Sequence, residues 1–297
     1  MTKFFERTYL TKSLQELVCE VLGRLSGDNI HTSAVYNLTT QFGGGKTHSL
    51  TLLYHLAKNG ANARGWQGMP MVLAQSGLQE IPNTRVAVFI GRSFDVMNGK
   101  GGANELHRNT PWGDLAYQLG GEKAFEIVAK HDKELTAPST DVIRKIIPKD
   151  KPVLILMDEV MDYVGRALNV KAGETKETTL ASQFYSFICN LSEVATSQEK
   201  ICLVVSLPRS EMEMSPEEEV IFARINKFLN RTSKSYILSE GMEIPEIVRR
   251  RLFEWTELPA DGKKAAEEYA SRLSDYNILH DDAVKAGYKG EDDLDVK

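Results

Sequence analysis

Apolar residues recur along this chain in two patterns, one strand-like and one helical. Short, largely apolar runs are typical of buried strands, and they occur at residues 33–38, 85–90, 153–157, 201–205 and 234–238. Around them, apolar residues recur every three to four positions, which predicts helices. These helices are expected at residues 13–25, 46–57, 112–119, 122–131, 139–147, 178–195, 215–229, 243–255 and 260–273. The alternation predicts an α/β fold, with about five parallel strands covered by helices on both faces.

The composition is that of a globular protein, with 42% hydrophobic and 26% charged residues. No apolar run approaches the roughly 20 residues of a membrane helix, and the N-terminus lacks the apolar core of a signal peptide. Three well-separated cysteines in apolar contexts, Cys19, Cys189 and Cys202, indicate buried thiols in a reducing compartment. We therefore expect a cytoplasmic protein that is not bound to a membrane. The net charge of −5 gives no overall attraction to nucleic acid.

A glycine-rich loop separates the first expected strand from the next helix. Its sequence, LTTQFGGGKTH at residues 38–48, matches the end of the phosphate-binding pattern G-x-x-x-x-G-K-[ST] at Gly45, Lys46 and Thr47. Thr40 stands where the first glycine of the pattern usually lies. The backbone N–H groups of such a loop surround a phosphate, and the start of the helix adds positive potential. Lys46 would reach the β- and γ-phosphates and Thr47 would bind Mg²⁺; the alternative is an ordinary turn that caps a helix.

A second motif, VLILMDE, begins at Val153 and ends in Asp158 and Glu159. A strand that is apolar on both faces belongs inside a parallel sheet, and the ligands of such sheets bind at the carboxyl ends of the strands. We therefore expect Asp158 to help hold Mg²⁺ and Glu159 to polarise the attacking water, as in a Walker B strand. The alternative is a buried strand that ends in a solvated acidic turn.

Three further features are compared with AAA-type ATPases. The strand ICLVV is followed by Ser206, where those enzymes carry a small polar residue that touches the γ-phosphate or the water. Arg224 and Arg231 lie in and just after the helix before the last strand, where an arginine finger acts on a neighbouring subunit. Arg249 to Arg251 correspond to a sensor arginine. The alternatives are a serine that only ends a strand, and arginines on solvated helix faces or in salt bridges.

A second glycine-rich segment, NGKGG at residues 98–102, lacks the Lys-Ser/Thr ending of a phosphate loop. No helix follows it directly. We interpret it as a flexible surface loop that emerges at the same edge of the sheet, within reach of a substrate.

Several stretches together resemble one family. They are FFERTYLTKSLQELVCEVLGRLSG, LTTQFGGGKTHSLTLLYHLA, TPWGDLAYQLGG, LILMDEV and IPEIVRRRLFE, which span about residues 4–255. They are similar to a prokaryotic family of large predicted AAA-type P-loop ATPases, catalogued as a domain of unknown function. In that family FGGGKTH is the usual form of the loop, so Thr40 is no defect. The resemblance implies an ATP site formed by Phe42, Gly43, Gly44, Gly45, Lys46, Thr47 and His48.

The resemblance also implies a wider context. It assigns Mg²⁺ to Thr47 and Asp158, and catalysis to Glu159, with arginine fingers that imply a homo-oligomer. Members are often encoded beside DNA methyltransferase-like genes, which suggests a defence role with DNA or a methyltransferase-like protein as partner. They usually continue beyond the RRLFE helix. This chain is therefore expected to correspond to the N-terminal ATPase module, with a core at residues 1–242, a partial helical lid at 243–285 and a flexible tail at 286–297.

The resulting hypothesis is an Mg²⁺-dependent ATPase that powers remodelling of nucleic acid or of a protein partner. The alternative is a nucleotide-gated switch or scaffold with negligible turnover. A small-molecule kinase is disfavoured because the sequence shows no acceptor pocket and because an Asp-Glu pair suits water as the acceptor.

Overall fold

The computed structural model describes residues 2–40, 45–103, 105–208, 214–237 and 247–250, together with residues 262, 264, 265 and 268. The chain divides into two compact units, Lys12–Leu238 and Met1–Thr11 with Ser239–Lys297, which we treat separately. The second unit contains α1 (Thr2–Glu6) and a helical segment at residues 247–250. Most of the expected lid at 243–285, the whole tail at 286–297 and loop residues 41–44 lie outside the described residues.

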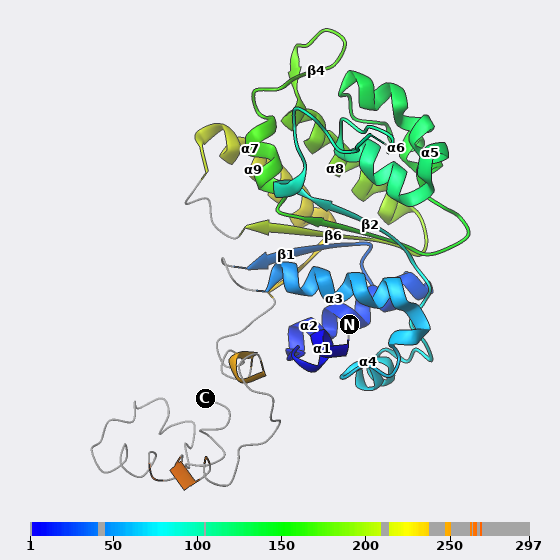
Figure 1. Cartoon of the computed structure of the whole chain (residues 1–297), viewed down its shortest axis with the longest axis vertical. Coiled ribbons are helices and arrows are strands. Elements are labelled where there is room, and N and C mark those ends of the chain that lie inside the picture. The colour runs from blue at the N-terminus through cyan, green and yellow to red at the C-terminus, as the bar shows by residue number, and fades with distance from the viewer. Residues whose placement is uncertain are drawn as a thin grey trace. The chain divides into compact units, whose positions relative to one another are not determined.

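A five-stranded parallel sheet forms the centre of the larger unit (Figure 1), which confirms the predicted architecture. The strand order is β2-β3-β6-β1-β7, with bounds β1 (Val35–Thr40), β2 (Arg85–Ile90), β3 (Val153–Asp158), β6 (Ile201–Pro208) and β7 (Lys234–Tyr236). β6 therefore lies between the strand that leads into the glycine loop and the strand that ends in the acids. Leu38 is level with Ser206, and Met157 is level with Val205. This register brings Asp158 level with Ser206 at the carboxyl edge.

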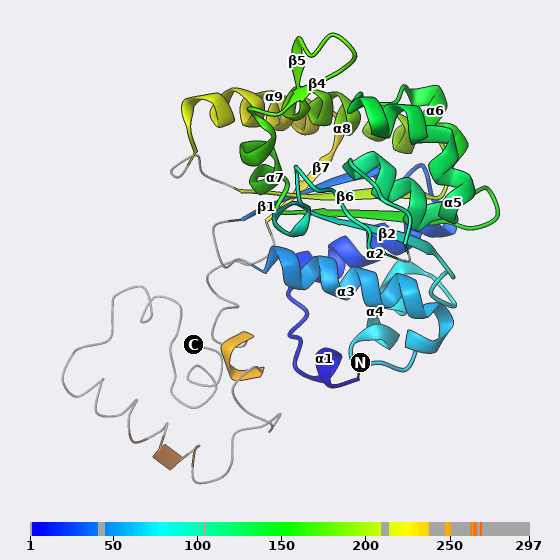
Figure 2. The ribbon, with the colours of Figure 1, turned by 45° about the horizontal axis from the view of Figure 1, so that its top comes forward.

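Helices cover both faces of the sheet (Figure 2). One face carries α2 (Lys12–Ser26), α3 (Lys46–Asn59) and α4 (Met69–Ser76). The other carries α5 (Pro111–Glu134), α6 (Thr140–Ile146), α7 (Val160–Ala167), α8 (Leu180–Ser197) and α9 (Pro216–Thr232). β3 is buried along its whole length, as expected of a strand covered on both faces. No helix in the described part of the chain is long and apolar enough to span a membrane.

The two helices predicted between residues 112 and 131 are confirmed, because Gly120 and Gly121 inside α5 have backbone angles that are not helical and divide it into two helical stretches. Other elements differ from the sequence-based expectation. The sequence pattern missed α4, α7, the 3-10 helix η1 (Gly60–Ala63) and the hairpin of β4 (Lys171–Ala172) and β5 (Thr178–Thr179). Each of these elements is too short to show a clear periodicity of apolar residues. α4 and α7, with eight residues each, complete only about two helical turns, and the others are shorter still.

Candidate functional site

Asp158, at the end of β3, accepts hydrogen bonds at both carboxylate oxygens. Thr47 Oγ1 donates to Oδ2 at 2.7 Å, and Ser206 Oγ donates to Oδ1 at 2.5 Å. The backbone N–H of Glu159 donates to the same Oδ1 at 3.0 Å. Asp158 is 5% exposed, so these bonds fix a buried carboxylate at the sheet edge. The structure thus brings together three residues that the sequence placed on α3, β3 and β6.

The N-terminal end of α3 points to the same edge. Gly45 is its N-cap, with φ 84° and ψ 8° in the left-handed region that glycine adopts readily. Glycine has no side chain to occupy the first N–H groups of the helix, so this helix end suits an anionic ligand. His48 lies in the same first turn and is half-buried.

Lys46 is the first residue of α3 and interacts electrostatically with Asp158. Burial lowers the pKa of its ammonium group, and the Asp158 carboxylate acts in the opposite direction. A bound anion would favour the charged form of this lysine further, because an opposite charge nearby raises the pKa of an amine.

The oxygen atoms of Thr47 and Asp158 suit a magnesium ion. Mg²⁺ prefers oxygen ligands and is commonly held by one or two carboxylates together with phosphate oxygens and water. The hydroxyl and carboxylate lie 2.7 Å apart, at the end of the helix that would bind the phosphates. These residues therefore fit the ion that the sequence analysis assigned to them.

Glu159 follows Asp158 in an uncommon backbone conformation. Its φ of 50° and ψ of 42° lie in the left-handed region, where it forms the N-cap of α7. Burial raises the pKa of its carboxyl group, the carboxylates of Asp158 and Asp162 raise it further, and Arg92 acts in the opposite direction. A carboxylate whose pKa is raised toward neutrality is a better proton acceptor.

The turn after β2 contacts the backbone of Glu159. This turn is the 3-10 helix η2 (Gly91–Ser93). A Cβ atom on Gly91 would lie 2.0 Å from the carbonyl oxygen of Glu159, closer than real Cβ contacts occur. Arg166 of α7 holds the turn in place, because its guanidinium donates to the carbonyl oxygens of Gly91 and, at 2.9 Å, of Phe94. The position of Glu159 therefore depends on the absence of a side chain at residue 91.

A comparison with protein families decides the relationship of the chain. Residues 1–237 match the family model described as the DUF499 N-terminal domain. The chain belongs to the DUF499 family. This confirms the resemblance drawn from the glycine-loop and LILMDEV stretches, whereas no curated protein matches the chain.

Arg224 and Arg231 of this DUF499 chain are exposed on α9. Their positive charges act to lower the pKa of the Tyr185 phenol on α8. The arginine that acts to lower the pKa of Glu159 is Arg92. A finger serves a neighbouring subunit, so this role of Arg224 and Arg231 stays a prediction. Of the expected sensor arginines, Arg249 and Arg250 lie in the helical segment of the smaller unit, and Arg251 lies outside the described residues.

A cavity of about 420 Å³ opens beside Thr47 and Asp158 in the DUF499 chain. It is walled by α3, by β2 with the turn that follows, and by the start of α5. Residues 98–102 reach this edge of the sheet as expected, since Lys100 lines the cavity. The contributions of Gly91, Arg92 and Gln118 were not predicted from the sequence. Only Gly91, directly after the strand RVAVFI, could have indicated that another segment of the backbone lies close to this turn.

Proposed function

We propose that the carboxyl edge of the sheet binds Mg·ATP and hydrolyses it. The observation that carries this proposal is the hydrogen bond from Thr47 to Asp158, with Ser206 on the second oxygen of the same carboxylate. In a phosphate-binding loop, the hydroxyl after the lysine binds Mg²⁺ and an acid on a nearby strand completes the site. The pairing of Thr47 with Asp158 is what that chemistry requires.

Each residue would have a defined task. Lys46 would neutralise charge on the β- and γ-phosphates, and Thr47 and Asp158 would hold Mg²⁺, which supplies charge neutralisation when bound. Ser206 keeps the Asp158 carboxylate oriented through its 2.5 Å hydrogen bond, and a contact from Ser206 to the γ-phosphate is part of the proposal. Glu159 would orient the attacking water and accept its proton. Phosphoryl transfer requires mainly such positioning and charge stabilisation.

Assignment to the AAA-type class rests on the sequence resemblance and is supported by β6, which lies between β1 and β3 and carries Ser206 at its carboxyl end. With that assignment we propose a cytoplasmic, homo-oligomeric ATPase in a prokaryotic defence system. It would remodel DNA or a protein partner, such as a methyltransferase-like protein.

A second candidate is a nucleotide-gated switch with negligible turnover in a single subunit. In this candidate a single subunit does not complete the site, since Arg224 and Arg231 act on Tyr185 and not on Glu159 of the same chain. Turnover would then require an arginine from a neighbouring subunit.

Replacement of Lys46 by alanine tests the nucleotide site. We expect ATP affinity, measured by isothermal titration calorimetry, to fall about 10- to 100-fold, because hydrogen bonds to charged groups contribute about 1.5–3 kcal/mol. Lys58→Ala is the matched control, since Lys58 is an exposed lysine near the other end of α3 and its loss should leave the affinity unchanged. Equal affinity of the native protein and Lys46→Ala would place the nucleotide elsewhere.

A further inference from the structure

The cavity beside Asp158 extends along α3, away from the phosphate-binding end. Thr47, Thr51 and Tyr54 all line it, and they lie on successive turns of one helix face. At a rise of about 1.5 Å per residue, Tyr54 lies about 10 Å beyond Thr47. Phosphates bound at the helix N-terminus would occupy only the end of this cavity beside Thr47. The part beside Thr51 and Tyr54 therefore offers space for a different molecule.

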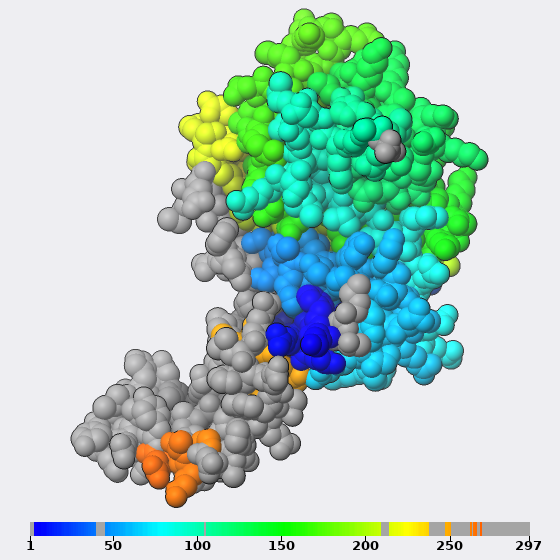
Figure 3. Space-filling model, in the orientation of Figure 1, coloured from blue at the N-terminus to red at the C-terminus, as the bar shows by residue number. Residues whose placement is uncertain are grey.

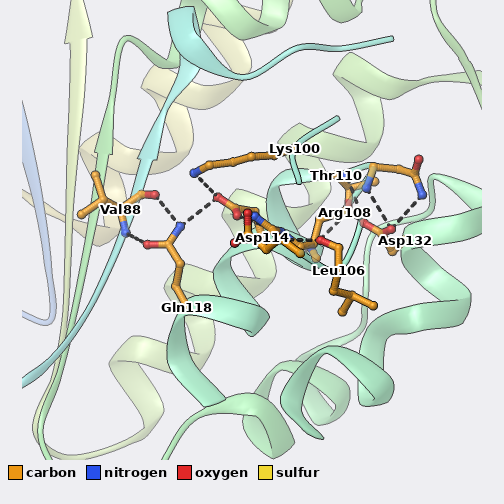
Figure 4. Close-up of polar contacts among 11 residues, drawn as sticks. Val88, Lys100, Leu106, Arg108, Thr110, Asp114, Gln118 and Asp132 are labelled. Carbon is orange, nitrogen blue, oxygen red and sulfur yellow. Dashed lines mark hydrogen bonds and ion pairs between the residues drawn. The ribbon is translucent and has the colours of Figure 1, made fainter. Parts of the chain in front are cut away.

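The wall opposite α3 is apolar and held firmly. Val88 and Ile90 of β2 line it together with Phe94. Because β2 is an edge strand, its outward backbone groups need partners, and Gln118 supplies them for Val88. The Val88 N–H donates to Gln118 Oε1 and Gln118 Nε2 donates to the Val88 carbonyl, each at 2.8 Å (Figure 4). Ile90 is 42% exposed, so this wall presents apolar surface to the cavity.

Lys100 brings a positive charge to the cavity. Its Nζ donates to Asp114 Oδ2 at 2.9 Å, and its side chain is 52% exposed. Its backbone exchanges two hydrogen bonds with Arg108, each 2.8 Å. In the space-filling view, the segment between β2 and α5 borders α3 on this face of the larger unit (Figure 3). Lys100 is thus held at the cavity from both its backbone and its side chain.

Lys100 belongs to a small ionic cluster in which Lys100 and Arg108 face the carboxylates of Asp114 and Glu105, and its side chain stays 52% exposed. Asp114 is buried and also accepts from Arg108 Nε at 3.2 Å and from Gln118 Nε2 at 2.8 Å (Figure 4). Arg108 has a further partner in the exposed carboxylate of Glu105. Asp114 therefore accepts hydrogen bonds from three side chains. The ammonium group of Lys100 has three N–H donors, and its bond to Asp114 uses one of them. Lys100 is placed to bind an anionic group of a ligand.

We propose that this cavity is a second ligand site, for a small organic molecule with an apolar body and one anionic group, bound at Lys100. Its volume of about 420 Å³ lies in the usual range for small-molecule pockets, which combine apolar walls with a few placed polar groups. The proposal does not depend on ATP hydrolysis. A small-molecule kinase was disfavoured partly because the sequence shows no acceptor pocket. That objection no longer holds, since the cavity provides space for a second molecule beside Asp158.

Two fluorescent probes with the same aromatic body test the site. The anionic probe is 8-anilinonaphthalene-1-sulfonate, and N-phenyl-1-naphthylamine lacks the sulfonate. We expect Lys100→Gln to weaken the anionic probe about tenfold, as for loss of a charge-assisted hydrogen bond, and to leave the neutral probe unchanged. Ile90→Ser should weaken both probes. Lys171→Gln, at an exposed lysine of β4, is the control that should change neither.

Saturation with Mg·ADP separates this site from the nucleotide site. We expect both probes to bind the full chain equally well with and without Mg·ADP. Displacement of the anionic probe by Mg·ADP would overturn the proposal, since the cavity would then hold part of the nucleotide. An unchanged affinity of the anionic probe in Lys100→Gln, or no binding of either probe, would overturn it as well. Failure of the nucleotide proposal would appear separately, as an absence of ADP binding.

Discussion

Glu159→Gln is expected to reduce ATP turnover at least about a hundredfold while ATP still binds. Glutamine keeps the shape of the side chain but cannot accept a proton from water, and general base catalysis contributes about 10²–10⁴-fold. In the native protein, turnover should fall as the pH drops through the raised pKa of Glu159, above the usual carboxyl range. Phosphate release over a pH series, with the ATP dissociation constant measured in parallel, checks both expectations.

Stability measurements show whether the loss of turnover in Glu159→Gln comes from unfolding. A pKa raised in the folded state means that ionised Glu159 opposes folding once the pH exceeds its unfolded pKa. The variant should therefore be at least as stable as the native protein at neutral pH. Glu193→Gln, at an exposed position of α8, is the control that should keep full turnover. A Glu159→Gln protein with native turnover and an unaltered pH profile would show that another group is the base.

Gly91→Ala is expected to destabilise the fold by about 1–3 kcal/mol, the usual cost of forcing an extra group into packed structure. The added methyl group would lie 2.0 Å from the carbonyl oxygen of Glu159 and 3.2 Å from Tyr163 Cβ. The backbone of Glu159 must then move. Since a misplacement of about 1 Å can cost roughly 10²-fold in rate, turnover should fall as well. Urea denaturation and phosphate-release assays measure the two effects.

Gly65→Ala provides the matched control, because a Cβ at Gly65 meets no atom within 4 Å. Its stability and turnover should match those of the native protein. Native behaviour of Gly91→Ala would contradict the inferred support of Glu159 by the turn after β2. A loss of stability without a loss of turnover would show that the turn matters only for folding.

The central part of the candidate site follows from the sequence. Parallel strands end at a common edge, so the glycine loop after one strand and Asp158 after another were expected to meet there. The pattern also indicated Thr47 as the partner of that acid, and the hydrogen bond between them agrees. Ser206 was expected at this edge because the strand that precedes it was predicted to belong to the same parallel sheet. Local patterns sufficed because each residue is fixed by the end of a regular element.

The surroundings of the site could not be predicted in this way. Gln118 lies in a helix whose pattern gives no sign that its amide satisfies the edge strand at Val88. Gly91 matters only because α7 brings the Glu159 carbonyl against it. Such contacts join segments that are distant in sequence, and their residue types are equally common on solvent-exposed surfaces.

The magnesium dependence of ATP affinity tests most directly the claim that Thr47 and Asp158 hold Mg·ATP at the sheet edge. The measurement compares the native protein with Asp158→Asn, each titrated with ATP in excess Mg²⁺ and in EDTA. We expect Mg²⁺ to tighten ATP binding at least about tenfold in the native protein, and this gain to disappear in Asp158→Asn, where a carboxylate ligand is lost. An identical Mg²⁺ effect in both proteins, or no ATP binding by the native protein, would contradict the claim.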